Sequence, residues 1–140
     1  NIEIKSEPSE YGRSQPIHVK DFADRVQGVI RAHVENSNII LQSFDFAVLS
    51  YYHQVFPEVR LSALVESESP QFVLDTLGFA PSIYSSSYQY LTADWINFCH
   101  AKGMKVIPWT INTTEQMQHF ISLGVDGIIT DYPNRAPKIH

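Results

Sequence analysis

Cysteine is nearly absent from this chain of 140 residues, since Cys99 is the only one. A single cysteine excludes an internal disulfide and a metal cluster held by several thiolates. Cys99 follows Ile96 and Trp95 at the spacing of one helix face. We therefore expect a buried structural thiol rather than a nucleophile.

Long apolar runs are also lacking, the longest being residues 39–41 and 61–65. A helix that crosses a bilayer needs about 20 apolar residues, so no transmembrane segment is predicted and these runs fit buried strands. No signal peptide is visible, and residues 1–5 already show a strand pattern. We therefore expect the chain to begin inside a domain.

Positive charge is scarce as well, because no stretch concentrates lysine or arginine and the formal net charge is -5. A nucleic-acid partner is not predicted, since tracking phosphates requires a basic patch. An anionic substrate would need a local cation at its site.

Several catalytic motifs are missing from the sequence. It has no glycine loop that cradles phosphate, no G-x-S-x-G elbow and no paired-histidine zinc spacing. Histidines fall on or near predicted helices, where surface or helix-end roles are expected: His18, His33, His53, His100 and His119. A general acid and base for hydrolysis are therefore not evident in these residues.

What the sequence does contain is a regular alternation of short apolar runs and amphipathic segments, typical of strands followed by helices. Strands are predicted at residues 1–5, 39–43, 60–65, 81–84, 105–112 and 126–130. Helices are predicted at residues 16–35, 46–56, 70–78, 92–103 and 113–123. Pro70 opens one helix, Gly78 ends it, and Asn112 with Glu115 has the spacing of a capping box.

Strand starts recur about every 21 to 23 residues, which suits one strand, one helix and two short loops. Continuous apolar strands between amphipathic helices predict an α/β fold with a parallel sheet, and the constant period favours a (β/α)8 TIM barrel. A complete barrel has eight strands and about 250 residues. We therefore expect a partial barrel with about six strands, lacking its N-terminal strands.

Side chains at the carboxyl ends of barrel strands are the candidates for chemistry. Glu3 and Lys5 share a strand face and could bind a cation and a phosphoryl oxygen, or form a salt bridge on an exposed edge. Trp109 should point the same way as Ile107 and Ile111, either lining a ligand or plugging the barrel mouth. Asp131 is expected to orient its neighbours at the rim, with metal ligation as the alternative.

Pro108 departs from an ideal central strand because it has no backbone N–H. A short or locally bulged strand would tolerate this missing donor.

Several segments in register resemble the glycerophosphodiester phosphodiesterase family. They are residues 1–5 (NIEIK), 41–45 (LQSFD), 103–112 (GMKVIPWTIN) and 124–133 (GVDGIITDYP). The resemblance implies a TIM-barrel hydrolase of lipid and glycerol metabolism. Such an enzyme cleaves glycerophosphodiesters to glycerol 3-phosphate and an alcohol with one divalent cation, Mg²⁺ or Ca²⁺.

By the same resemblance, Glu3 ligates the metal, Lys5 contacts the phosphate, and Phe44 and Trp109 line the substrate cleft. The family's His-Arg pair, its Glu-x-Asp metal pair and a second histidine have no match in residues 1–140. The resemblance therefore implies that residues 1–140 are the C-terminal portion of one such domain. The catalytic histidines would lie upstream of Asn1, and the isolated chain would be inactive.

Two other interpretations remain open. A non-catalytic module could associate through its open sheet edges, with another copy or with the missing N-terminal segment. An unrelated phosphate-binding barrel would need a glycine-rich loop after its last strands, which the sequence lacks.

Overall fold

The computed structural model describes residues 1–137 and shows one parallel sheet. Its five strands lie in chain order, each paired with the next. They are β1 (Ile2–Glu3), β2 (Ile40–Ser43), β3 (Arg60–Val65), β4 (Ile83–Ser86) and β5 (Lys105–Val106). Parallel neighbours in chain order require a crossover between strands, and here each crossover contains a helix. The predicted α/β class is therefore confirmed.

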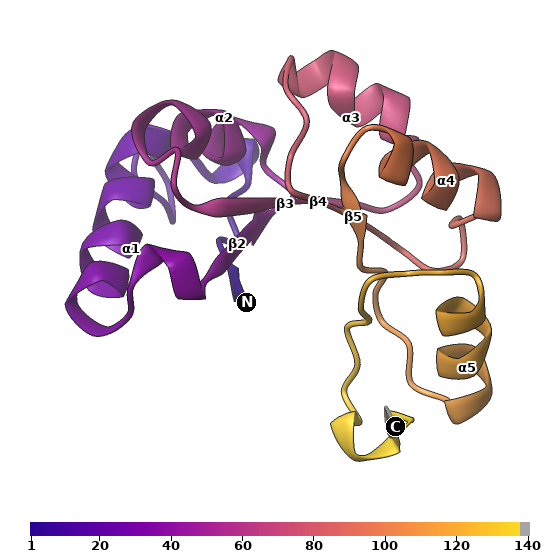
Figure 1. The fold of residues 1–140 in the computed structure, drawn as a ribbon. Helices are drawn as coiled ribbons and strands as arrows, with labels where there is room; N and C mark the ends of the chain where they lie inside the picture. Colours follow the sequence, from indigo (N-terminus) through magenta and orange to yellow (C-terminus); the bar gives the residue numbers. More distant parts are fainter. Residues whose placement is uncertain (138–140) are drawn as a thin grey trace.

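The helices follow the strands and form an arc around one side of the sheet (Figure 1). They are α1 (Val19–His33), α2 (Phe46–Val55), α3 (Pro70–Leu77), α4 (Ala93–Ala101) and α5 (Thr114–Ser122). Short 3₁₀ helices occur at η1 (Pro8–Glu10), η2 (Asn36–Asn38) and η3 (Pro133–Arg135). Within residues 1–137, no helix combines the length and apolar character that crossing a bilayer requires.

Local signals in the sequence explain where the helices begin and end. Ser69 and Thr92 accept hydrogen bonds from backbone N–H groups of the first turn, and Gly78 ends α3 in the left-handed region with φ 73°. The predicted cap of α5 was wrong by one residue, because Thr113 accepts the bond from Gln116 N–H. Asn112 is occupied elsewhere, since its side chain bonds Thr130 and Asp131.

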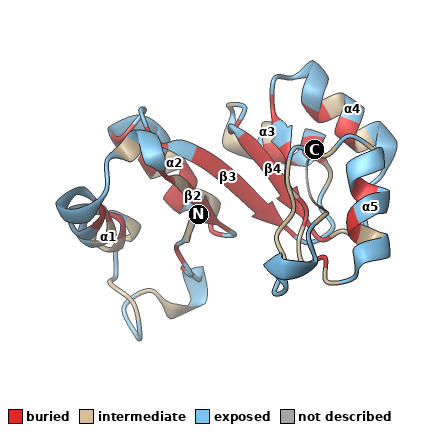
Figure 2. Cartoon of the chain, turned by 60° about the horizontal axis from the view of Figure 1, so that its bottom comes forward, coloured by how far each residue is buried: buried red, intermediate tan, exposed pale blue. Residues whose placement is uncertain are grey.

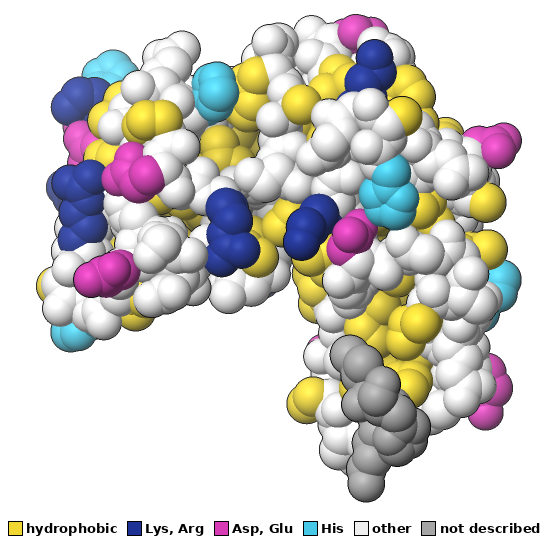
Figure 3. Space-filling model, in the orientation of Figure 1, with side chains coloured by type: hydrophobic (Ala, Val, Ile, Leu, Met, Phe, Trp, Pro, Cys, Tyr) yellow, Lys and Arg dark blue, Asp and Glu magenta, His cyan; other side chains and the backbone are white. Residues whose placement is uncertain are grey.

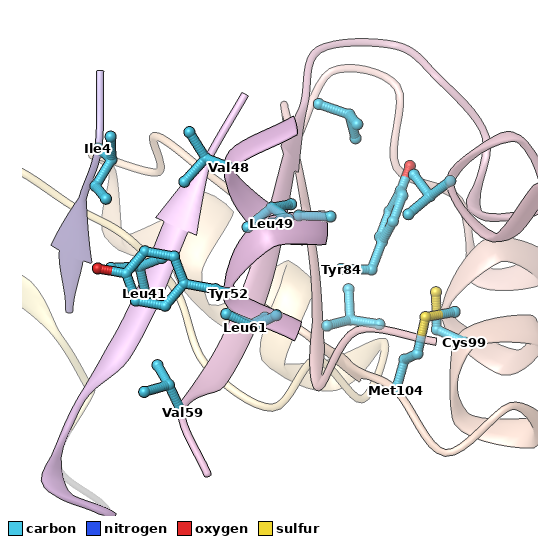
Figure 4. Close-up of a cluster of buried hydrophobic side chains, with 14 of the residues drawn as sticks. Ile4, Leu41, Val48, Leu49, Tyr52, Val59, Leu61, Tyr84, Cys99 and Met104 are labelled. Carbon is cyan, nitrogen blue, oxygen red and sulfur yellow. The ribbon is translucent and has the colours of Figure 1, made fainter. Parts of the chain in front are cut away.

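The main hydrophobic core lies between the sheet and the helices. Leu41, Ala63, Tyr84 and Val106 project from successive strands and are fully buried. Figure 4 shows Leu49 of α2 among these strand side chains, and in Figure 2 the buried surface follows the strands and the inward helix faces. Burial of this apolar face holds the helices against the sheet.

The opposite, concave face of the sheet has a different composition. One row of residues across this face, one from each strand in register, consists of Glu3, Gln42, Ser62, Ile83 and Lys105. Gln42 and Ser62 are buried although both are polar. The concave face is thus the more polar one, and side chains at its carboxyl end can reach a bound ligand.

The predicted sixth strand, residues 126–130, is not a regular strand. The segment runs beside β5, with Asp126 N–H bonded to Val106 O at 2.9 Å and Ile129 N–H bonded to Pro108 O at 2.9 Å. Pro108 has no N–H to return, so the ladder is interrupted there. The sheet of residues 1–137 therefore has five regular strands, and β5 is short and ends before Pro108, a condition under which the missing donor is tolerated.

Two further predictions need correction. The fourth strand ends at Ser86 rather than at Tyr84, and β5 is shorter than residues 105–112. Ile111 is fully buried in the core cluster on the helix side, whereas Ile107 and Trp109 are only partly buried. The two-residue alternation ends with the regular strand, so these side chains do not share one face.

Candidate active site

A hollow of about 280 Å³ lies at the carboxyl end of β1 and is lined by Glu3, Lys5, Glu7 and Phe44, together with Ile4 and Ser6. Glu3 and Lys5 are both exposed there. The ion pairs of residues 1–137 lie elsewhere: Lys20–Asp24, Arg31–Glu58 and His100–Asp126. The alternative of a Glu3–Lys5 salt bridge therefore finds no support in the structure, and both charged groups remain available to a ligand.

Phe44 and Trp109 meet above the concave face. Their ring centroids are 5.7 Å apart at an interplanar angle of 81°, an edge-to-face contact. Trp109 is anchored because its indole N–H donates to Ser85 O at 3.0 Å. Phe44 follows β2, whereas Trp109 follows β5, and in a flat sheet these strands would be about 14 Å apart. The contact therefore requires the sheet to curl toward its concave side.

Asp45 connects the loop after β1 to the start of α2. Its carboxylate accepts hydrogen bonds from Ser6 Oγ at 2.6 Å, from the Tyr11 hydroxyl, and from Ala47 N–H at 3.0 Å as the cap of α2. Burial and the nearby Asp45 carboxylate raise the pKa of Tyr11, so its hydroxyl stays a donor. The loop that follows Lys5 is thereby fixed against β2.

A larger hollow of about 440 Å³ adjoins the first one and shares Ser6, Glu7 and Phe44 with it. Its remaining lining comes from η1, the start of α2, the end of β3 with the loop that follows it, and α3: Pro8, Asp45, Phe46, Leu64, Val65, Glu66, Glu68, Phe72 and Thr76. Ligand pockets are commonly of this size and combine apolar walls with a few polar groups. Because they share three lining residues, we treat the two hollows as one recess at the carboxyl ends of the strands.

Asp131 lies at the rim, beyond the end of β5. It accepts a hydrogen bond from Asn112 Nδ2 at 2.9 Å, and its own N–H donates to Asn112 Oδ1 at 3.0 Å. Arg135 donates to Asn112 O at 2.9 Å and stacks over the Tyr132 ring. Asp131 therefore contributes to the structure of the rim, which fits the first of the two predicted roles.

Histidine and cysteine side chains of residues 1–137 lie away from the recess, since neither hollow is lined by either type. Burial raises the pKa of the Cys99 thiol to about 12, which confirms the expected inert and buried cysteine. His100 of α4 bonds Asp126 at 2.9 Å, and the same carboxylate accepts Val106 N–H. The structure thus supplies no acid or base from these types at the hollows within the described chain.

Sequence reasoning missed the bridging role of Asp45 and the second hollow. An aspartate between a strand and a helix signals an N-cap, but its bonds to Ser6 and Tyr11 depend on how the loop returns. The wall of the larger hollow joins β2 to α3, so no local pattern in the sequence marks it.

A curved parallel sheet with helices outside and a recess at the strand ends defines a portion of an α/β barrel with a candidate ligand-binding site. Comparison with known proteins agrees. The sequence model of the glycerophosphoryl diester phosphodiesterase family matches residues 1–135, and the chain belongs to this family. The fold is accordingly a partial (β/α)8 TIM barrel, as predicted from the sequence.

Individual relatives support the same assignment. A glycerophosphodiester phosphodiesterase of Bacillus altitudinis is 28% identical over 144 residues, covering 99% of this chain and 54% of the relative. A solved glycerophosphodiester phosphodiesterase of Parabacteroides distasonis superposes with a TM-score of 0.77 at 26% identity, covering 94% of this chain and 52% of that one.

A third comparison concerns the fold alone. An Oleispira antarctica phosphodiesterase, solved with the product sn-glycerol-3-phosphate, gives a TM-score of 0.79 at 19% identity, covering 96% of this chain and 52% of that one. The chain thus spans about half the length of the relatives it matches.

Proposed function

We propose that this chain forms part of the active site of a glycerophosphodiester phosphodiesterase, which hydrolyses a diester to glycerol 3-phosphate and an alcohol. The observation that carries this proposal is the convergence of Glu3, Lys5 and Phe44 on one hollow, with Trp109 against Phe44. A charged end beside an aromatic wall suits a polar phosphate joined to a glycerol carbon chain.

Each of these side chains has a distinct part in the proposed reaction. Lys5 binds a phosphoryl oxygen and offsets its negative charge. Phe44 and Trp109 line the glycerol side of the cleft and exclude water from it. Water adds to phosphorus while the bond from phosphorus to the alcohol oxygen breaks, and the alcohol leaves with a proton.

A divalent cation, Mg²⁺ or Ca²⁺, fits the donor type of this hollow, since Glu3 and Glu7 present carboxylates there. Glu3 is the proposed ligand. Residues 1–137 contain no group of three histidine, cysteine or acidic side chains arranged to hold a metal, so the other ligands would come from outside these residues. When bound, the cation would neutralise charge that develops on the phosphoryl oxygens.

The acid and base of the reaction are also proposed to come from outside this chain. In support, the relatives are about twice as long as the chain, and the described histidines do not line either hollow. We accordingly propose that residues 1–140 form the C-terminal portion of a single TIM-barrel domain. The isolated chain would then bind product without catalysing hydrolysis.

Release of glycerol 3-phosphate tests the proposal. The chain of 140 residues should show no release, whereas a protein that also carries the N-terminal barrel half should show metal-dependent release. In that longer protein, Glu3→Gln and Lys5→Met should each lower kcat/KM at least about 100-fold, while Glu115→Gln on α5 should leave it unchanged. Activity of the isolated chain would contradict the external acid and base, and an inactive longer protein would contradict the function.

A non-catalytic module that associates through its sheet edge is the second candidate. One observation favours it. Beside the open edge of β1, an apolar hollow of about 530 Å³ is lined by Ile2, Pro16, Phe22, Arg25, Val26, Val29 and Ile30. An exposed apolar surface next to an unpaired strand edge favours contact with another chain.

A further inference from the structure

The larger hollow is lined by exposed aromatic side chains. Phe44 is 50% exposed and Phe72 is 48% exposed, and both line it together with Phe46. Phe72 is well positioned because its N–H donates to Ser69 Oγ at 3.2 Å in the capped first turn of α3. Exposed aromatic rings around a recess commonly mark a binding site for a ligand with apolar surface.

The rim of the same hollow is acidic. Glu7, Glu66 and Glu68 line it, and of the residues in 1–137 that form its wall, none is lysine, arginine or histidine. Glu68 is held in place, since its carboxylate accepts the N–H groups of Glu66 and Ser67 at 3.0 Å each. The Tyr84 hydroxyl also donates to Glu68 O at 2.6 Å, which fixes this loop to the sheet.

One class of ligand binds favourably to aromatic rings and to carboxylates at the same time. A quaternary ammonium group has apolar methyl surface and positive charge, so it gains from ring faces and from nearby carboxylates at once. An anionic group would be repelled by the rim, and a neutral polyol would gain little from the phenylalanine rings. The hollow therefore favours an alkylammonium cation.

The position of the hollow relates this cation to the substrate. Phe44, Ser6 and Glu7 line both hollows, so a molecule bound at Lys5 can extend directly into the larger one. Its phosphate would lie by the only basic side chain that lines either hollow within residues 1–137, and its other end would reach the acidic rim. The recess is thus complementary to a zwitterion.

We propose that the larger hollow is the head-group subsite and that it selects diesters with a choline-type head group. This inference rests on the proposed function, because it assumes that the phosphate binds at Lys5. Phe72, Glu66 and Glu68 determine the specificity, while Phe44 separates the two parts of the substrate.

Binding to the chain of 140 residues can be measured by NMR titration with choline, glycerol and glycerol 3-phosphate as separate probes. Choline should shift the amide signals of Glu66 and Phe72, and glycerol should not. Phe72→Leu and Glu66→Gln should each weaken choline binding about threefold or more and leave glycerol 3-phosphate binding unchanged. Lys5→Met should do the reverse, and Glu115→Gln should change neither.

The outcomes separate the two proposals. Glycerol 3-phosphate binding that depends on Lys5, without choline binding, would overturn the head-group subsite and leave the proposed function standing. Choline binding without glycerol 3-phosphate binding would overturn the function on which the inference rests. Choline binding that is unchanged in Phe72→Leu and Glu66→Gln, with folding verified by circular dichroism, would also overturn the subsite.

Discussion

Asp45 stabilises separate segments through one buried carboxylate. It caps α2 through Ala47 N–H and also accepts bonds from Ser6 and Tyr11 of the loop after β1. Thr113 is a helix cap alone, since it caps α5 by accepting a hydrogen bond from Gln116 N–H. The two residues therefore allow capping to be separated from loop fixation.

Asp45→Ala should lower the free energy of unfolding by about 2 to 4 kcal/mol, because it removes a helix cap and the hydrogen bonds that Asp45 accepts from the Ser6 and Tyr11 hydroxyl groups. Thr113→Ala should cost about 1 kcal/mol, the usual value for a cap alone. Urea denaturation followed by circular dichroism measures both. Equal losses in the two variants would show that the Ser6 and Tyr11 bonds contribute nothing to stability.

Asp126 makes stability depend on pH. Burial acts to raise its pKa, but hydrogen bonds from Val106 N–H and His100 outweigh burial and hold the pKa below its usual 3.8. A carboxyl with a lowered pKa stabilises the fold above the unfolded pKa, and this contribution is lost as pH falls through the folded pKa.

The difference in the free energy of unfolding between the unmodified chain and Asp126→Asn should therefore become smaller as pH is lowered from about 6 to about 2. Urea midpoints measured across this range provide the test. A difference that stays constant with pH would contradict the lowered pKa.

At the scale of elements, the segment beside β5 is held by a side chain rather than by a regular ladder. Pro108 cannot donate, and Asn112 compensates by bonding Thr130 and Asp131. Asn112→Ala should speed amide exchange of Asp131 about tenfold, without changing exchange in β2 and β3. Hydrogen exchange followed by NMR measures this, with Asn97→Ala on the exposed side of α4 as the control.

The elements also show what the sequence could predict. Helix ends were predictable because Ser69, Thr92 and Gly78 act on neighbouring backbone groups. The meeting of Glu3, Lys5 and Phe44 at strand ends followed from the parallel order of the strands. The larger hollow was not predictable, because its wall depends on sheet curvature and on loop paths that join residues far apart in the chain.

At the scale of the whole molecule, the edge of β1 is the feature from which we predict self-association. Val29 is 64% exposed on α1 beside the apolar hollow at this edge. Association of the chain with itself would bury this surface. On the face seen in Figure 3, basic and acidic side chains are interspersed.

The chain of 140 residues should therefore form dimers or larger species at concentrations of tens of micromolar. Val29→Asp should shift it toward the monomer, because the contact would then bury an unpaired charge. Val55→Asp, at an exposed position on α2, is the matched control. Light scattering measures the molar mass of each variant in solution. An unmodified chain that stays monomeric at every concentration would contradict edge association.

The contact between Phe44 and Trp109 has a consequence for the order of folding. Adjacent strands pair in chain order, so each βα unit can add to the one before it across a short loop. The two rings instead close a long loop across β3 and β4, which is entropically the costlier step. The sheet should therefore assemble strand by strand. The contact between Phe44 and Trp109, which fixes the curvature of the sheet, should form late, after the folding transition state.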